Sequence, residues 1–251
     1  MRFLPTYQHF RGFMIVLKRK NIIIFSVLIA TIFTMILCVG AIVTKPIGEA
    51  SANKIKIVLD AGHGGIDGGV SGVVTGIKES ELNLKVVKKL ETYLISAGMS
   101  VTLTRNSEAG LYGVATKNLK RKDMEKRRDI IKSVEPHLVV SVHMNKYSLS
   151  TRRGAQVFFK KGDENAKLLA ASIQKNFNDM EEAVRECSIL TGDYYILNCT
   201  EYTSVIAECG FLSNPEDEAL LINENYQDKI AYNIFKGIVG YLAQSSFNYN
   251  V

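Results

Sequence analysis

Short apolar segments alternate with amphipathic ones along most of the chain, and few folds accommodate this alternation. Apolar runs bounded by turn residues are typical of buried strands, whereas apolar side chains at helical spacing are typical of helices that cover them. The expected strands are residues 54–60, 99–104, 138–142, 154–160, 194–197 and 204–207. The pattern predicts a single α/β domain over residues 54–245, built on a mostly parallel sheet.

Amphipathic segments separate these strands. The expected helices are residues 80–97, 117–133, 165–178 and 226–242, together with a helix opened by Pro215. Ser80 is the expected N-cap of the first, whose predicted buried face is Leu82, Val86, Leu90 and Leu94. The predicted core positions of helix 165–178 are Leu168, Leu169, Ile173 and Phe177. Residues 181–193 are expected to be irregular or a short helix.

Helix 117–133 is strongly charged, with the basic runs Lys120–Lys122 and Lys126–Arg128. Its few apolar residues predict a helix with a solvated basic face. Contact of this face with an anionic polymer is the alternative.

The first expected strand runs into a glycine-rich turn, Leu59-Asp60-Ala61-Gly62-His63-Gly64-Gly65-Ile66-Asp67-Gly68-Gly69. Glycine lets a backbone turn sharply and approach a ligand closely. The spacing matches neither the phosphate-binding P-loop nor a clean dinucleotide fingerprint. His63, at the centre of the turn, is therefore a candidate metal ligand, although a lone loop histidine is more often structural.

Two further candidates follow strands or precede helices of the same sheet. His143 leaves the end of the strand 138–142, and Glu79 stands just before helix 80–97, where the helix dipole alone would favour a carboxylate. Parallel sheets gather their sites at the carboxyl ends of the strands. Two histidines and one carboxylate form a catalytic zinc set with one open position.

Glu208 follows a buried strand, where a carboxylate is either paired or functional. Close to a metal, it would take a proton from water and pass it to a leaving amine. Glu208 is therefore the candidate catalytic residue.

The N-terminal segment, residues 1–43, has the composition of an export signal or membrane anchor. Ile22–Val43 contains no charged residue, and at roughly 1.5 Å per residue it reaches about 33 Å, enough for a bilayer core. Lys18, Arg19 and Lys20 precede it, which predicts an exported remainder. Ala50–Ala52 resembles a cleavage site, so a cleaved signal and an uncleaved anchor both remain open. Residues 44–53 are the expected linker and 246–251 a tail.

Charge argues against a nucleic-acid partner. The formal net charge is +6, but residues 1–52 hold six basic residues and one acidic residue, against 25 and 24 in the remainder. The basic balance therefore comes from the leader and not from the predicted domain. The four cysteines lack C-x-x-C spacing, which argues against a cysteine zinc site but leaves one disulfide open.

Four ordered motifs between about Lys54 and Ala243 resemble the zinc-dependent N-acetylmuramoyl-L-alanine amidases of bacterial cell walls. The motifs are Asp60–Gly65, Glu79 with its helix, Ser141–Asn145 and Glu208–Asn214. The resemblance is greatest to the compact, sporulation-linked germination amidases. It implies a six-stranded sheet with helices on both faces, zinc bound by His63, Glu79 and His143, and Glu208 as the catalytic carboxylate.

The same resemblance implies cleavage of the amide between the muramic acid lactyl group and L-alanine of the peptidoglycan stem peptide. In a spore former, this cut would expose the lactyl carboxyl needed for muramic lactam in the cortex. The alternatives are a zinc peptidase that acts on wall peptides and a non-catalytic wall-binding module. A further alternative is an amidase that binds zinc weakly alone and needs an activating protein partner.

Overall fold

The computed structural model describes residues 19–43 and 54–248. The chain divides into two compact units, Met1–Ala52 and Asn53–Val251. The first contains the 25-residue helix α1 (Arg19–Val43). Within the described residues, no helix combines the length and the apolar character that a membrane crossing requires. The predicted cleavage site, Ala50–Ala52, and the predicted linker, 44–53, lie outside the described residues, as does the end of the tail, 249–251.

The second unit is built on a six-stranded sheet with the order β2-β1-β3-β6-β4-β5. The strands are β1 (Lys56–Ala61), β2 (Ser100–Leu103), β3 (Leu138–Asn145), β4 (Gln156–Phe159), β5 (Leu190–Thr191) and β6 (Thr203–Phe211). All neighbours pair in parallel except β4 and β6, which are antiparallel. The predicted mostly parallel, six-stranded sheet is thereby confirmed.

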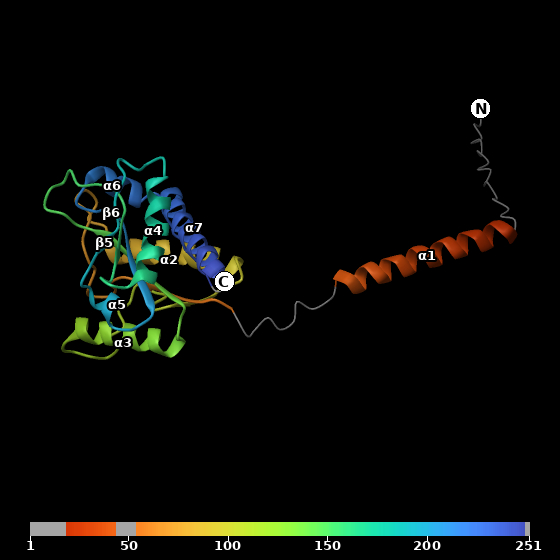
Figure 1. The fold of residues 1–251 in the computed structure, drawn as a ribbon, viewed down its shortest axis with the longest axis horizontal. Coiled ribbons are helices and arrows are strands. Elements are labelled where there is room, and N and C mark those ends of the chain that lie inside the picture. Colours follow the sequence, from red (N-terminus) through yellow and green to blue (C-terminus); the bar gives the residue numbers. More distant parts are fainter. Residues whose placement is uncertain (1–18, 44–53, 249–251) are drawn as a thin grey trace, which may run out of the picture. The chain divides into compact units, whose positions relative to one another are not determined.

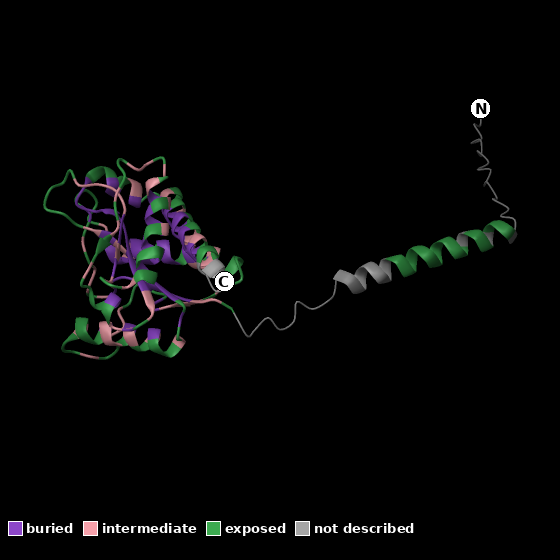
Figure 2. Ribbon diagram, in the orientation of Figure 1, coloured by how far each residue is buried: buried purple, intermediate pink, exposed green. Residues whose placement is uncertain are grey.

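Helices cover both faces of this sheet (Figure 1). One face carries α2 (Glu79–Ser96), α4 (Glu164–Asn178) and α7 (Glu224–Asn248) over the larger apolar core. The other carries α3 (Leu119–Val134) and α5 (Tyr195–Asn198) over a smaller cluster around Val58, Val139 and Ile206. Figure 2 shows the buried residues gathered along the strands and on the helix faces that meet them.

Several local predictions are confirmed. The four leucine and valine positions predicted on the inner face of α2 are fully buried. Helix α6 (Pro215–Leu221) begins at Pro215, after an N-cap formed by Asn214. The disulfide that the sequence leaves open does not form among the cysteines that the structure describes, because Cys187, Cys199 and Cys209 are free thiols.

The predicted N-cap of α2 is wrong. The helix begins at Glu79, and Ser80 lies buried inside its first turn. The backbone amide of Glu79 donates to the carbonyl of Val70, and that of Ser80 donates to the carbonyl of Gly68. Because the preceding loop supplies these acceptors, the helix start needs no side-chain cap.

Two other predictions on the covering layers are also wrong. Residues 194–197 are predicted to form a strand, but Tyr194 is the N-cap of α5 and the other three residues lie inside this helix, where Ile196 and Leu197 are buried against the smaller core. The sixth strand is instead β5, inside the stretch expected to be irregular. Leu168 is 48% exposed, because the inner face of α4 is set by Leu169 and Ile173.

Candidate metal centre and active site

Three neighbouring strands deliver the candidate residues to one edge of the sheet. Strand β1 leads directly into the turn that holds His63, and β3 carries His143 near its end. In β6, Glu208 lies opposite His143 in register. Glu79 comes from the first turn of α2. Residues that are far apart in sequence therefore meet because parallel strands end together.

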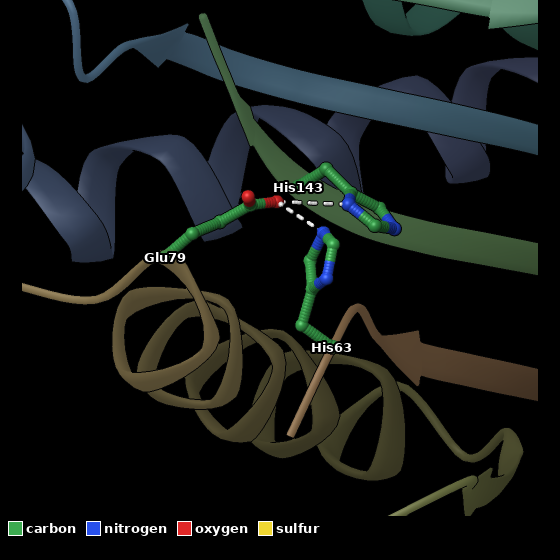
Figure 3. Close-up of side chains that lie close together, drawn as sticks. All are labelled: His63, Glu79 and His143. Atoms are coloured by element: carbon green, nitrogen blue, oxygen red, sulfur yellow. Dashed lines mark hydrogen bonds and ion pairs between the residues drawn. The ribbon is translucent and has the colours of Figure 1, made fainter. Parts of the chain in front are cut away.

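His63, Glu79 and His143 converge on one point (Figure 3). Oε1 of Glu79 lies 3.3 Å from Nε2 of His63 and 2.9 Å from Nδ1 of His143. One potential ligand atom from each residue lies within 4.8 Å of the others. The structure thus brings together the three residues that the sequence predicted as metal ligands.

The donor set and its surroundings fit a divalent metal of the zinc type. Two imidazoles and one carboxylate are the donors of many catalytic zinc sites. A Cβ atom at Gly62 would lie 2.2 Å from the ring of His143, and one at Gly69 would lie 2.4 Å from Oε2 of Glu79. Glycine at both positions therefore allows the backbone to close around the donor set.

His63 is oriented by its own turn. Its backbone has a φ of 61°, in the left-handed region that few non-glycine residues adopt. Nδ1 lies 3.0 Å from Oδ1 of Asp67, so Nε2 is directed toward Glu79. Burial lowers the pKa of His63, but the hydrogen bond and charge of Glu79, with Asp67, raise it above its ordinary value.

Glu79 is buried yet ionised. Its Oε2 accepts a hydrogen bond from the amide of Val70 at 2.9 Å. Its Oε1 accepts one from the amide of Met144 at 3.2 Å. Burial raises the pKa of this carboxyl, but the two histidines lower it well below its usual range. The carboxylate is therefore available as a ligand at neutral pH.

The pKa of Glu208 is shifted in the opposite direction from that of Glu79. Its carboxylate is buried, and Oε2 has no hydrogen-bond partner among the described residues. Burial raises its pKa to about 7, with the charge of Glu79 in the same direction and the two histidines opposing it. A carboxyl group with a pKa near neutrality both accepts and donates a proton readily.

A cavity of about 540 Å³ lies over these groups. Its lining includes the three candidate ligands and Glu208. Further charged side chains, among them Lys120, Lys146 and Asp193, line it together with walls of aromatic, aliphatic and sulfur-containing side chains. These walls include Met124, Met144, Tyr194, Tyr195 and Ile196. The cavity leaves room for part of a substrate beside the candidate donors.

The sequence reasoning missed a group of buried polar residues beneath the turn of His63. Helix α3 was expected to expose its basic residues, but Arg127 is only 1% exposed and pairs with Asp60 and Asp123. Arg105 is also buried, behind the same turn. The i,i+4 spacing of Asp123 and Arg127 and an aspartate within an apolar strand were the available signals.

Comparison with known proteins identifies related chains. A family model described as N-acetylmuramoyl-L-alanine amidase (Amidase_3) matches residues 57–239. The germination-specific N-acetylmuramoyl-L-alanine amidase of Bacillus subtilis is 34% identical over 207 residues, which cover 80% of this chain and 84% of that protein.

Solved structures give the same picture. The CwlD amidase from Clostridioides difficile, solved in complex with the GerS lipoprotein, is similar with a TM-score of 0.73 and 35% identity. The match covers 76% of this chain and 99% of that one. An N-acetylmuramoyl-L-alanine amidase from Clostridium difficile 630 has a TM-score of 0.68 at 27% identity, covering 76% and 98% of the two chains.

Proposed function

The chain belongs to the N-acetylmuramoyl-L-alanine amidase family, and we propose that it acts through a zinc ion held by His63, Glu79 and His143. As a member it is an enzyme that hydrolyses the amide bond between N-acetylmuramic acid and L-alanine in peptidoglycan. This substrate separates it from the peptidase and the non-catalytic module considered from the sequence.

The convergence of the two histidines and Glu79 is the observation that carries the zinc proposal. An ionised Glu79 between two imidazole nitrogens offers a compact set of nitrogen and oxygen donors. The close approach of His143 to Gly62 restrains its ring, and Asp67 restrains that of His63. Carboxylate partners of this kind fix the tautomer of a ligating histidine.

In this proposal, Glu208 moves the proton. Zinc, when bound, supplies a Lewis acid that polarises the scissile carbonyl and lowers the pKa of a water to about 7. Glu208, which lines the cavity and whose pKa burial raises to about 7, accepts a proton from the attacking water. The water oxygen bonds to the lactyl carbonyl carbon, the C–N bond breaks, and Glu208 returns the proton to the alanine nitrogen. The second proton of the water passes from the new lactyl carboxyl group to the amine. The products are therefore a lactyl carboxylate and a stem peptide with a free, protonated amino group.

The substitution Glu208→Gln tests this role. It keeps the size of the side chain but removes its ability to take a proton, so release of stem peptides should fall about 10²- to 10⁴-fold. Zinc content should stay at the wild-type level, because Glu208 is not a proposed ligand. Glu201→Gln, at an exposed position, is the control and should release peptides normally. Unchanged release by the Glu208 variant would refute the assignment.

We also propose that the amidase acts on the spore cortex, where its cut exposes the lactyl carboxyl required for muramic lactam. The similarity to a germination-specific amidase supports this role. Deletion of the gene in the native host should abolish muramic lactam in the cortex, measured by chromatography of digested peptidoglycan. A cortex with normal lactam content would contradict the proposal.

We also propose that an activating protein partner helps this chain to bind zinc. The similar amidase of Clostridioides difficile was solved in complex with a lipoprotein. Zinc occupancy of this chain, measured by elemental analysis, should rise when it is purified from its native cell together with bound proteins. Equal occupancy after purification alone would argue against an activating partner.

The substrate also fixes the proposed location. Peptidoglycan lies outside the cytoplasmic membrane, so the catalytic unit is proposed to be exported by the N-terminal segment. Protease added to intact protoplasts should degrade residues 54–245. The mass of the mature chain then distinguishes removal of the leader from its retention as a membrane anchor.

A further inference from the structure

Three consecutive backbone carbonyls of the metal-site turn face two buried arginines. The carbonyl oxygen of Ala61 accepts from Nε of Arg105 and from Nη1 of Arg127, both at 2.8 Å. The carbonyl of Gly62 accepts from Nη2 of Arg105 at 2.8 Å. That of His63 accepts from Nη2 of Arg127 at 2.5 Å. Two guanidinium groups thus fix the backbone on which His63 stands.

Arg127 is itself held in place from the sheet and from its own helix. Its Nη1 donates to Oδ1 of Asp60 at 2.5 Å, and its Nε donates to Oδ2 of Asp123 at 2.6 Å. Asp60 in turn accepts from the hydroxyls of Ser141 at 2.6 Å and Thr104 at 2.7 Å. The guanidinium therefore links helix α3, strands β1 and β3 and the turn of His63.

Arg105 reaches the turn from the segment that follows β2, and it shares only the carbonyl of Ala61 with Arg127. Besides the two carbonyls of the turn, it donates to the carbonyl of Ser80 at 2.8 Å and to that of Ser107 at 2.9 Å. Ser80 follows Glu79 directly in the first turn of α2. Arg105 therefore ties the backbone beside one candidate ligand to the backbone beside another.

The hydrogen bonds from these two arginines stabilise an unfavourable backbone conformation at the turn. His63 adopts a left-handed backbone conformation, which L-residues with a Cβ atom avoid unless the surroundings impose it. The three carbonyls belong to a sharp turn, where neighbouring strands offer few amide donors. Without the guanidinium groups, the carbonyls of Ala61 and His63 would lose these donors, and that of Gly62 would keep only Nδ2 of Asn83, at 3.1 Å. The turn would then relax toward ordinary dihedral angles.

We propose that Arg127 and Arg105 are positioning residues that set the affinity of the site for zinc by holding the backbone of His63. The inference rests on the proposed zinc site and adds to it the residues that preorganise it. Neither arginine is proposed as a ligand or as a proton carrier. A guanidinium has five donors in a planar fork, whereas a lysine ammonium is a point charge that cannot reach separated carbonyls.

The test uses the conservative variants Arg127→Lys and Arg105→Lys in the full chain. The substitution Arg127→Lys keeps a cation beside Asp60 and Asp123 but loses the fork to Ala61 and His63. Arg121→Lys is the control, since Arg121 lies in the same helix, is 78% exposed and pairs only with Glu125 among the described residues. Zinc affinity is measured by competition with a chromogenic chelator, and coordination by the visible spectrum of the cobalt-substituted protein.

We expect both positioning variants to bind zinc about 10- to 100-fold more weakly than wild type, the range typical for residues that orient metal ligands. Their cobalt spectra should differ from the wild-type spectrum, and the Arg121 variant should match wild type in both measurements. A lower free energy of unfolding does not by itself weaken zinc binding by this amount. A metal-free variant that stays more than about 99% folded by urea titration changes the apparent affinity negligibly.

Folded lysine variants with wild-type zinc affinity and cobalt spectra would overturn the inference. If Arg127→Lys does not fold, Arg105→Lys decides, because it leaves both aspartate ion pairs intact. If wild type itself binds no zinc, the proposed metal site fails and the inference fails with it. That outcome is recognised in the wild-type sample alone, so the two failures are distinguishable.

Discussion

Gly62 determines how closely His143 can approach the backbone of the site. A Cβ at this position would stand 2.2 Å from the imidazole ring, well inside van der Waals contact. Gly62→Ala should therefore displace His143 and weaken zinc binding, while the fold is retained because the conflict is confined to one side chain. Isothermal titration with zinc measures the effect.

Gly68→Ala is the matched control for this substitution. Gly68 lies in the same loop, but its nearest neighbour would be the flexible side chain of Lys78. This variant should bind zinc almost as wild type does. Equal zinc affinity of the Gly62 and Gly68 variants would show that the close approach of His143 has no role in the site.

Asp60 should give the protein a measurable dependence of stability on acidity. Burial raises the pKa of Asp60, but Arg127 and the hydroxyls of Ser141 and Thr104 outweigh it and lower the pKa from 3.8 to about 2. A lowered folded-state pKa contributes stability that is present above about pH 4 and lost as the pH falls toward about 2. The shift corresponds to about 2 kcal/mol.

Comparison with Asp60→Asn isolates this contribution. The unfolding free energies of both proteins are measured by urea titration from about pH 5 to about pH 2 with a chelator present, so that metal loss does not contribute. The advantage of wild type over the variant should shrink by about 2 kcal/mol across this range. An advantage that stays constant with pH would contradict the proposed charge state of Asp60.

The candidate ligands were predictable from the sequence, but the buried residues that hold their backbone in place were not. His63, His143 and Glu208 each stand at or soon after the end of a short apolar run, and that pattern is visible in one dimension. Arg127 stands in a helix whose face is charged almost throughout, so nothing local distinguishes it from its solvated neighbours. Its burial depends on Asp60, which is distant in sequence.

Helix α6 is short, and Asn214 caps its first turn. Oδ1 of Asn214 accepts from the amides of Glu216 and Asp217, both at 2.9 Å. Asn214→Ala removes this cap and should lower the unfolding free energy by about 1 kcal/mol. Asn214→Asp keeps the acceptor and should recover most of the loss in thermal or urea unfolding. Equal losses in the two variants would mean that the cap does not account for the effect. The lost interaction would then be the hydrogen bond that Nδ2 of Asn214 donates to the carbonyl of Ser150.

The existence and the buried faces of the long helices and strands could be predicted more reliably than the positions of their ends. The shortest elements were also harder to predict. Helix α2 has apolar residues at regular spacing, and its buried face follows from that spacing alone. Residues 194–197 form an apolar run too short for any period to separate strand from helix. Their helical form follows from packing of Ile196 and Leu197 under α3, which is a tertiary contact.

The order of the strands is a property of the whole molecule. Alternating strands and helices predict a parallel sheet, but they do not state which strand lies between which others. The observed order sets β3 between β1 and β6, and this neighbourhood brings His63, His143 and Glu208 to one cavity. The sequence motifs identified the residues, and the strand order explains why they meet.

The zinc content of the purified protein is the most direct test of the proposed metal site. Elemental analysis of wild type, purified from its native cell together with any bound protein, should give one zinc ion per chain, and His63→Ala, purified in the same way, should lose zinc and peptide release together. His137→Ala, which removes an exposed histidine that accepts from the amide of Lys56, should retain both. A wild-type protein that releases stem peptides without bound metal, or a His63→Ala variant with full zinc and full activity, would contradict the account.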